Sequence, residues 1–244
     1  MPVERWTPDQ LKLVLELYVI TPFGKIHSKN PEVIALAGRI GRTSSAVALK
    51  MVNFASLDPT LGQRGMKNAS KRDREVWDEF FDGLVEGAVE DGFSEREQQG
   101  YLFDSERVGR DIASVTNVRR GQSFFRRMIL ASYDNRCSIS SISNEMLLVA
   151  SHIDPWSLNS NRRLDPTNGI CLCSIFDKAF DTGLIAVGDD FEVLVSSRLS
   201  ENDCEKLRAI GSSKIRLPSR FLPDQMLFRS HRRKFPGSFH LLQN

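Results

Sequence analysis

The sequence predicts an α+β fold, in which a helical N-terminal part precedes a part that mixes short strands with helices. Apolar residues recur at helical spacing through residues 1–60 and again through residues 70–89. Residues 147–187 instead contain an apolar run ending in Ser-His-Ile, a polar loop, a second apolar run opened by Asn-Gly, a short helix and a third apolar run. That order is typical of strand, loop, strand, helix, strand, and we expect the chain to be organised around it.

Composition limits the class of protein. The 244 residues suffice for one large or two small domains, and 41% hydrophobic residues allow a buried core. The formal net charge of +2 is close to balanced, so nucleic-acid binding has to depend on local basic clusters. The sequence shows neither an apolar run long enough to span a membrane nor the apolar region of a secretory signal. We therefore expect a cytoplasmic protein without a membrane partner.

The four cysteines predict buried free thiols. They lack the paired Cys-x-x-Cys spacing that is typical of zinc sites. Cys171 and Cys173 alternate within an apolar run, which places them on the same side of a strand. The alternative, a zinc site, is disfavoured by this spacing.

Three helices are predicted near the N-terminus. Residues 7–10, Thr-Pro-Asp-Gln, supply an N-cap, a proline at the first helical position and a capping-box glutamine. A second helix is predicted to start after residues 30–31, Asn-Pro, and to end at Gly41, and a third to cover residues 45–54. Two helices joined by a glycine-containing turn are typical of the helix-turn-helix arrangement, whose last helix can enter a major groove.

Trp6, the turn at residues 41–43 and the helix after it make this part resemble the three-helix Myb-like DNA-binding units. The resemblance implies DNA binding, with Arg42 near the DNA and Lys50 on a backbone phosphate. A purely structural packing module is the alternative. The residues that we assign to the core of this unit are Leu49, Val52 and Phe54.

The middle of the chain predicts a domain boundary. We expect a helical, helix-turn-helix-like domain over residues 1–95, a linker with partial helix over 96–120, and a second domain with a C-terminal extension over 121–244. The second domain opens with a helix that carries Arg126 and Arg127. These two arginines either reach DNA phosphates or form a solvated basic face.

Within residues 147–187, the phrases Ser-His-Ile, Asn-Gly and Asp-Lys-Ala-Phe-Asp-Thr-Gly-Leu resemble the signature of the HNH endonucleases. The resemblance is to the branch with Ala/Ser-His-Ile, Asn-Gly and His-Asp-Lys-x-Phe-Asp-x-Gly-Leu. It implies a ββα-metal nuclease domain that hydrolyses DNA phosphodiester bonds, of restriction or defence type. The matching residues are His152, Pro155, Trp156, Asp165, Pro166, Asn168, Gly169, Asp177, Lys178, Phe180, Asp181, Gly183 and Leu184.

Two residues are predicted to be catalytic. Phosphodiester hydrolysis needs a deprotonated water, a cation beside the charged transition state and help for the leaving oxygen. An imidazole titrates near neutral pH, so His152 is the expected general base, in agreement with the resemblance. Asn168 is expected to bond across the loop and hold His152, as the asparagine of the family does, although Asn-Gly is also an ordinary turn signal.

The predicted metal ligands lie on the short helix. Asp177 and Asp181 are four residues apart, which places both carboxylates on one helical face. They suit one Mg²⁺ or Mn²⁺ ion. Asp181 is the favoured ligand, and Asp177 alternatively caps the helix. Ser151 stands where several HNH nucleases carry an acidic residue or a histidine.

The chain departs from the family at Phe176, which stands where the third histidine is expected. The phenylalanine cannot bind a metal ion. Either the site works with a loosely held, hydrated ion, or it is impaired and the chain is a pseudo-nuclease that acts as a DNA-binding protein. We favour the active nuclease and leave the second hypothesis open.

Further basic residues are predicted to contact DNA. Arg162 and Arg163 lie in the loop between His152 and Asn168, which borders the expected site. Arg232 and Arg233 belong to a C-terminal cluster that either grips phosphates or forms a solvated tail. The predicted partner is double-stranded DNA, and a cut through both strands would suggest a homodimer.

Overall fold

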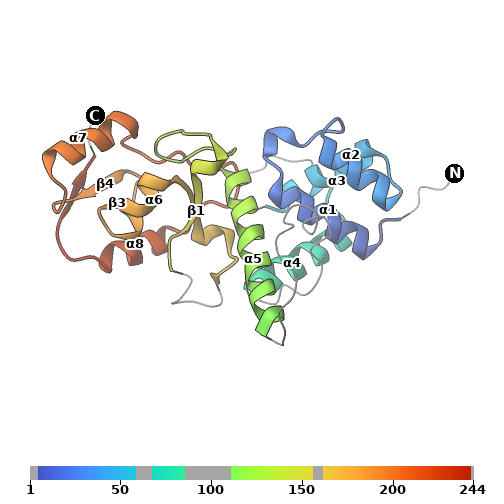
Figure 1. The fold of residues 1–244 in the computed structure, drawn as a ribbon. Coiled ribbons are helices and arrows are strands. Elements are labelled where there is room, and N and C mark those ends of the chain that lie inside the picture. Colours follow the sequence, from blue (N-terminus) through green and yellow to red (C-terminus); the bar gives the residue numbers. More distant parts are fainter. Residues whose placement is uncertain (1–4, 59–67, 86–110, 156–161, 243–244) are drawn as a thin grey trace.

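The computed structural model describes residues 5–58, 68–85, 111–155 and 162–242 (Figure 1). Helices alternate with two small antiparallel sheets in these residues, so the fold class is α+β, as the sequence predicted. The N-terminal helices are α1 (Pro8–Ile20), the short η1 (Phe23–Lys25), α2 (Pro31–Ile40), α3 (Ser44–Ala55) and α4 (Lys71–Val85). The long helix α5 (Asp111–Ser132) stands between them and the remaining elements (Figure 1). Those elements are η4 (Glu145–Leu147), β1 (Leu148–His152), η6 (Pro166–Asn168), β2 (Gly169–Cys173), α6 (Ser174–Asp181), β3 (Ile185–Val187), β4 (Val193–Ser196), α7 (Glu201–Ile210), α8 (Gln225–Arg233) and β5 (Phe239–Leu241).

The N-terminal helices begin and end where their capping residues predict. The Thr7 hydroxyl accepts from the Gln10 amide at 3.2 Å, and the Gln10 side chain accepts from the Thr7 amide at 3.3 Å, which completes a capping box. Asn30 caps α2, and Gly41 ends it in the left-handed region at φ 68°. Thr43 caps α3. The predicted order of three helices is therefore confirmed.

The third helix faces the core through a different set of residues than the sequence predicted. Val47, Met51 and Phe54 lie at helical spacing and are each 0% exposed. Leu49 falls on the other side of the helix and is 49% exposed, so its assignment to the core is wrong. The outward face of α3 therefore carries an apolar side chain where a DNA-reading helix would present polar ones.

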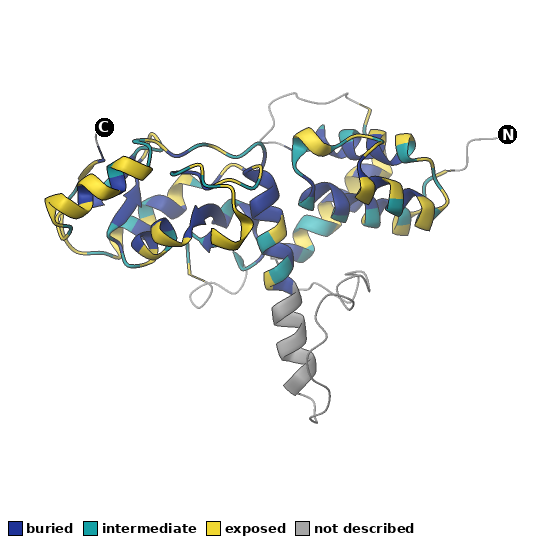
Figure 2. Ribbon diagram, turned by 45° about the horizontal axis from the view of Figure 1, so that its top comes forward, coloured by how far each residue is buried: buried dark blue, intermediate teal, exposed yellow. Residues whose placement is uncertain are grey.

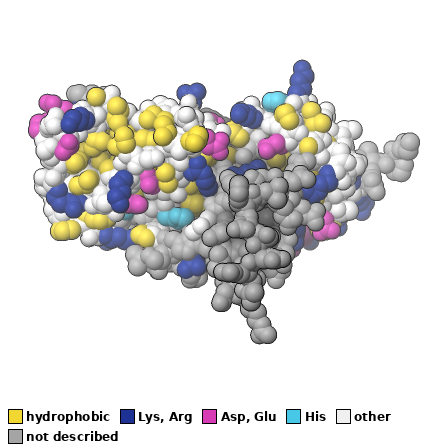
Figure 3. All heavy atoms as spheres, in the orientation of Figure 1, with side chains coloured by type: hydrophobic (Ala, Val, Ile, Leu, Met, Phe, Trp, Pro, Cys, Tyr) yellow, Lys and Arg dark blue, Asp and Glu magenta, His cyan; other side chains and the backbone are white. Residues whose placement is uncertain are grey.

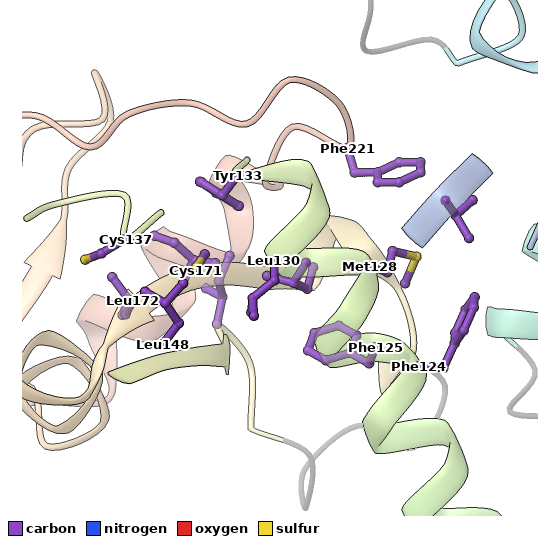
Figure 4. Packing of buried hydrophobic residues seen from close by; sticks show 14 of the residues in the cluster. Phe124, Phe125, Met128, Leu130, Tyr133, Cys137, Leu148, Cys171, Leu172 and Phe221 are labelled. Carbon is purple, nitrogen blue, oxygen red and sulfur yellow. The ribbon is translucent and has the colours of Figure 1, made fainter. Parts of the chain in front are cut away.

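Helix α5 packs against both the N-terminal helices and the first sheet. It contacts α1 on one side and the strands β1 and β2 on the other. In Figure 4, Phe124 and Met128 point towards the N-terminal helices, whereas Leu130 and Tyr133 point towards the strands. Buried residues consequently form one core that runs from the N-terminal helices through α5 to the sheets (Figure 2). Residues 111–120, which the sequence assigned to a linker, belong to this helix, and the rest of that predicted linker lies outside the described residues.

The strand, loop, strand, helix, strand order is confirmed. Strands β1 and β2 pair antiparallel, from Leu148 opposite Cys173 to His152 opposite Gly169. Helix α6 follows β2 directly and packs on the same two strands. Strands β3, β4 and β5 form the second sheet, whose first pair is an antiparallel hairpin. All four cysteines are free and buried, as predicted, and none of the described helices combines the length and apolarity that crossing a bilayer requires.

The C-terminal segment returns to the end of α1 through Arg220. Its side chain is 1% exposed. The guanidinium donates hydrogen bonds to the carbonyl oxygens of Tyr18, Val19 and Thr21, with Val19 at 3.1 Å. It also lies 4.8 Å from the ring centroid of Tyr18. One side chain thus satisfies the last carbonyls of α1, which have no partner within the helix.

Gly169 is required by the close approach of α5. Its backbone, at φ −126° and ψ 147°, is extended and open to any residue. A Cβ at this position, however, would lie 2.3 Å from Ile129 Cδ1 and 2.8 Å from Phe125 Cζ. The Asn-Gly pair therefore marks a place where a helix lies directly on a strand.

Replacing Gly169 with alanine should lower the free energy of unfolding by about 1–3 kcal/mol, because two core side chains have to move. Urea denaturation measures the change. Gly38→Ala is the matched control, since a Cβ at Gly38 of α2 meets no atom within 4 Å and alanine favours the helix. Equal stabilities for the two variants would contradict the packing argument.

Candidate functional site

His152 ends β1 and is held from two sides. Its Nε2 lies 2.9 Å from the carbonyl oxygen of Arg163. Its ring stacks on that of Phe125 in α5, with centroids 4.1 Å apart and planes 6° from parallel. A carbonyl oxygen can only accept, so Nε2 carries the proton and Nδ1 is the basic nitrogen. The stacking on Phe125 fixes the plane of the imidazole, and the hydrogen bond to the Arg163 carbonyl fixes its tautomer.

The surroundings of His152 favour the neutral imidazole. Burial lowers the pKa of His152 below its usual 6.5, and the hydrogen bond to the Arg163 carbonyl opposes this effect in part. The ring is therefore largely neutral at pH 7. Neutral imidazole is the form that can accept a proton from water.

Asn168 ties together the two ends of the loop between β1 and η6. Its side chain is 1% exposed. The amide oxygen accepts from the Asp154 N–H at 2.8 Å, and the amide nitrogen donates to the carbonyl oxygens of Asp154 at 3.2 Å and Arg162 at 3.1 Å. Asn168 thus spans the loop, as predicted. It acts on His152 through the loop, whose Arg163 carbonyl holds the imidazole, and not by a direct bond.

Asp177 and Asp181 lie on α6, one turn apart. Asp177 is half-buried and Asp181 is exposed. Burial raises the pKa of Asp177; the Ser151 hydroxyl lowers it, and the Asp181 carboxylate raises it further. Partial burial of the carboxyl also raises the pKa of Asp181, whereas the positive charge of Lys178 lowers it. A cation near the pair would favour the charged form of both carboxylates.

Ser151 connects the two halves of the site. It precedes His152 on β1, and successive residues of a strand face opposite sides, so Ser151 faces α6 while His152 faces α5. The Ser151 side chain is 4% exposed, and its buried hydroxyl makes no well-formed hydrogen bond with the described residues. It nevertheless lies close enough to Asp177 to lower the pKa of that carboxyl. An under-satisfied buried hydroxyl is thus directed at the carboxylate-bearing helix.

These donors fit a hydrated hard cation. Among the described residues, no group of three or more His, Cys, Asp or Glu side chains is arranged to hold a metal ion. Mg²⁺ commonly keeps several waters and binds through only one or two carboxylates. The chemistry of Asp177, Asp181 and the Ser151 hydroxyl is compatible with that mode. It does not fit a transition metal that needs several nitrogen or sulfur ligands.

Phe176, predicted as a lost ligand position, is a core residue. It is 0% exposed. Its Cζ would lie 2.7 Å from a Cβ on Gly211, beside Ile139. The next residue, Asp177, is the one that interacts with Ser151. Phe176 therefore fills the core, and the side of α6 that faces Ser151 is formed by Asp177 and not by residue 176.

A Phe176→His variant should lose stability without gaining metal affinity. Burying an imidazole among apolar side chains and losing the phenyl ring should lower the free energy of unfolding by about 2–4 kcal/mol. Urea denaturation and Mn²⁺ titration measure the two effects. Phe176→Leu is the apolar control and should be less destabilised. Tighter Mn²⁺ binding by the histidine variant would restore position 176 as a ligand position.

Two of the predicted DNA-contacting arginines lie on α5 and make intramolecular contacts. Arg126 donates to the carbonyl oxygens of Leu148 at 2.7 Å and Glu145 at 2.9 Å, so it fastens the start of β1 to α5. Arg127 is exposed and forms an ion pair with Glu32 at 3.7 Å. Arg126 is therefore committed to the fold, whereas Arg127 remains at the surface.

The arginines near the site are also paired with carboxylates. Arg162 contacts Asp224 at 3.2 Å, and its Nε lies 3.4 Å from Asp165. Arg232 contacts Asp189 at 2.5 Å. Arg233 is exposed and lines a shallow pocket with Asp189, Arg229 and Arg232. Figure 3 shows basic side chains dispersed among apolar and acidic ones on the visible face.

In the N-terminal helices, the predicted DNA contacts are engaged within the protein. The Arg42 guanidinium lies 4.8 Å from the Trp6 ring centroid and donates to the Arg5 carbonyl at 2.8 Å. Lys50 is 9% exposed, and its ammonium lies 3.0 Å from both carboxylate oxygens of Asp73, which is 0% exposed. The placement of Lys50 on a phosphate is thus corrected, because its ammonium is directed inward at Asp73.

Sequence reasoning missed the contribution of α8. His231 is 4% exposed, its Nε2 lies 3.1 Å from the Phe180 carbonyl oxygen, and its ring stacks on Phe180 with centroids 3.8 Å apart. Lys234 contacts Asp154 at 2.6 Å. The signal was present in the sequence: Leu227, Phe228 and His231 lie on one helical face. The basic neighbours of His231 drew attention to charge instead.

Comparison with known families agrees with this geometry. A family model described as HNH endonuclease matches residues 137–188. The matched segment contains both strands of the hairpin, α6 and β3, and with them His152, Asn168, Asp177 and Asp181. No curated protein matches the chain. An HNH domain implies a nuclease or DNA-binding function, with nucleic acid as the partner. Through residues 137–188, the chain carries a domain of the HNH endonuclease family.

Proposed function

We propose that the chain is a metal-dependent HNH endonuclease that hydrolyses phosphodiester bonds of double-stranded DNA. The observation that carries the proposal is the state of His152, a neutral imidazole with its tautomer fixed by the Arg163 carbonyl. Ser151, its neighbour on β1, faces Asp177 of α6. The proposed base lies at the end of β1, and the carboxylate pair lies on α6, the helix that packs on that strand.

His152 is the proposed general base. Its Nδ1 takes a proton from the attacking water, while the Nε2–H stays bonded to the Arg163 carbonyl. That carbonyl stabilises the imidazolium that forms, because its hydrogen bond favours the charged ring. Phe125 prevents the ring from rotating, and Asn168 keeps the loop that supplies the carbonyl in place.

Asp181 and Asp177 are the proposed metal ligands. Together they would hold one Mg²⁺ or Mn²⁺ ion, whose charge would offset that of the phosphate in the transition state and assist the leaving oxygen. The Ser151 hydroxyl lies close to the Asp177 carboxyl and lowers its pKa, which favours the charged form that binds a cation. The support for this assignment is the shared face of α6 and the buried, under-satisfied hydroxyl opposite it.

DNA is proposed to lie along the surface formed by the loop after β1 and by α8. Arg163, Arg232 and Arg233 are the basic residues that favour this path. The partly exposed Arg232 can exchange its ion pair with Asp189 for a phosphate, because surface ion pairs are weak, while its other terminal nitrogen stays bonded to the Val187 carbonyl. A restriction or defence role is what the family resemblance implies and belongs to the same proposal, and a cut through both strands would suggest a dimer.

A pseudo-nuclease that binds DNA without cutting it is the second candidate. The observation that favours it is the absence of a three-ligand metal group among the described residues. The two candidates differ in one measurable property, which is cleavage that depends on a divalent ion.

The test is nicking of supercoiled plasmid in Mg²⁺ or Mn²⁺. Asp181→Asn should reduce the nicking rate roughly 10²-fold, because a neutral amide binds the ion poorly. Asp190→Asn, in the exposed turn between β3 and β4, is the matched control and should keep the full rate. A wild-type protein that binds duplex DNA tightly but never nicks it would favour the pseudo-nuclease.

A further inference from the structure

The last turn of α8 contacts the end of α6 that carries Asp181. The His231 ring stacks on Phe180 at 3.8 Å with planes 1° from parallel, and its Nε2 lies 3.1 Å from the Phe180 carbonyl oxygen. Since the carbonyl can only accept, the ring donates through Nε2–H. Phe180 is the residue immediately before Asp181. His231 therefore binds the backbone next to the proposed ligand.

A second contact fixes the end of the same helix. Gly183 follows α6 at φ 64°, and a Cβ there would lie 2.1 Å from the ring of Phe235. The Phe235 ring in turn lies 5.1 Å from that of His231. The end of α6 thus fits against two neighbouring rings at the C-terminal end of α8.

The same segment also reaches the strand side of the site. Lys234 contacts the Asp154 carboxylate at 2.6 Å. The backbone N–H and C=O of Asp154 are both bonded to the Asn168 side chain. Residues 231–235, which we call the α8 clamp, therefore contact both the carboxylate helix and the loop that follows His152.

We propose that the α8 clamp sets the position of Asp181 relative to His152, and that His231 is its positioning residue. The proposal rests on the proposed nuclease function. His231 does not touch substrate or water in this scheme; it acts through the Phe180 carbonyl. Groups that orient metal ligands from behind influence affinity and rate strongly, commonly by 10- to 100-fold.

Burying the His231 imidazole is energetically unfavourable, and this supports a role for its Nε2–H donor. His231 Nδ1 is buried and has no hydrogen-bond partner among the described residues. A phenylalanine at 231 would fill the same space without leaving a buried nitrogen unpaired, and an unpaired buried polar group is destabilising. What the histidine adds is the Nε2–H donor. Burial lowers the pKa of His231 to about 4, so the ring is neutral at physiological pH.

Two substitutions separate the donor from the ring. His231→Phe keeps a ring on Phe180 and removes the donor, whereas His231→Gln keeps an N–H at the position of Nε2 and removes the ring. His240→Phe, at an exposed histidine of β5, is the matched control. The first readout is amide hydrogen exchange at Gly183 and Leu184, whose N–H groups bond to the carbonyls of Phe180 and Ala179.

We expect His231→Phe to speed exchange at these amides about 10-fold and His231→Gln to stay near the wild-type rate. In plasmid nicking, His231→Phe should lower kcat roughly 10- to 100-fold, with KM for DNA within about twofold, and should weaken Mn²⁺ binding. Glutamine should rescue most of both losses, and His240→Phe should change neither.

A separate variant tests the strand side of the clamp. Lys234→Met removes the contact with Asp154 without touching α6, and it should lower kcat about 10-fold while exchange at Gly183 is unchanged. If the phenylalanine variant does not fold, His231→Gln still tests the donor, because a glutamine variant as impaired as an unfolded protein would overturn the role of Nε2–H, and Lys234→Met tests the strand side. A wild-type kcat in Lys234→Met would overturn the link to the strand side.

The clamp fails if exchange and kcat in His231→Phe equal those of the wild type. It also fails if the phenylalanine and glutamine variants are equally impaired, since packing alone would then explain the effect. These outcomes differ from a failure of the nuclease proposal. In that case the wild type neither nicks DNA nor binds Mn²⁺, while the exchange comparison still shows whether His231 fixes the end of α6.

Discussion

Replacing His152 with alanine is expected to lower the rate of DNA nicking by roughly 10³-fold, within the range typical of general-base removal. The Arg163 carbonyl and the Phe125 ring hold the imidazole in place, so alanine removes the proposed proton acceptor from a fixed position. Duplex affinity, measured with Ca²⁺ in place of Mg²⁺, should stay within about twofold, because a neutral ring contributes little to phosphate binding. His27→Ala, at an exposed histidine, is the matched control.

The pH dependence of nicking provides a further check on the same residue. Burial lowers the pKa of His152, so the fraction of basic imidazole rises as pH increases through a value below 6.5 and is nearly complete at neutral pH. The rate should therefore climb in mildly acidic solution and level off near pH 7. The alanine variant should lack this rise of the rate with pH. A wild-type rise centred clearly above 6.5 would contradict the assignment.

Replacing Arg220 with alanine is expected to lower the free energy of unfolding by about 3–5 kcal/mol. The side chain is fully buried and supplies donors to three carbonyl groups at the end of α1. Alanine would remove the Arg220 donors from these carbonyls, of which that of Tyr18 also accepts from the Thr21 N–H, and would open a cavity beside Tyr18. Few single side chains in the described structure join segments so distant in the sequence.

Urea denaturation, followed by circular dichroism, measures this loss. Arg220→Lys should recover only part of it, because one ammonium cannot match the planar fork of the guanidinium. Arg136→Ala, at an exposed position in the loop after α5, should change stability by less than about 0.5 kcal/mol. A similar loss in the two alanine variants would show that the contacts of Arg220 with α1 contribute little.

The ββα segment could be predicted because its signals are local. Ser-His-Ile at the end of an apolar run, Asn-Gly at the start of the next and two aspartates four residues apart place each side chain by the period of its own element. The caps of α1 and α2 could be read in the same way. The expected roles of His152 and Asn168 came from the resemblance of these local phrases to the HNH signature and from the chemistry of an imidazole.

Residues whose role depends on a distant partner could not be placed. Lys50 looked like a cation on a recognition helix, but Asp73 of α4 neutralises it in the interior. Arg126 looked like a phosphate contact, but the carbonyls that it binds belong to β1 and η4. Sequence shows the charge of a side chain and not the group that satisfies it.

The surroundings of Phe176 could not be predicted for a related reason. Family comparison gave the residue type expected at one position of the helix, but not the direction of that position in this chain. The contact with Gly211 of the segment after α7 decides it. The position where the family carries a histidine is therefore also a point at which the C-terminal segment packs on α6.

Helix α5 limits how far the chain can be shortened. The segment that matches the family begins at Cys137, after α5 has ended, yet the ring beneath His152 and the side chains that cover Gly169 come from that helix. A fragment excised at the family boundary would leave the imidazole unsupported on one side. The opposite side of α5 would in turn be uncovered without α1, so the smallest autonomous fragment that contains the HNH segment has to retain the N-terminal helices.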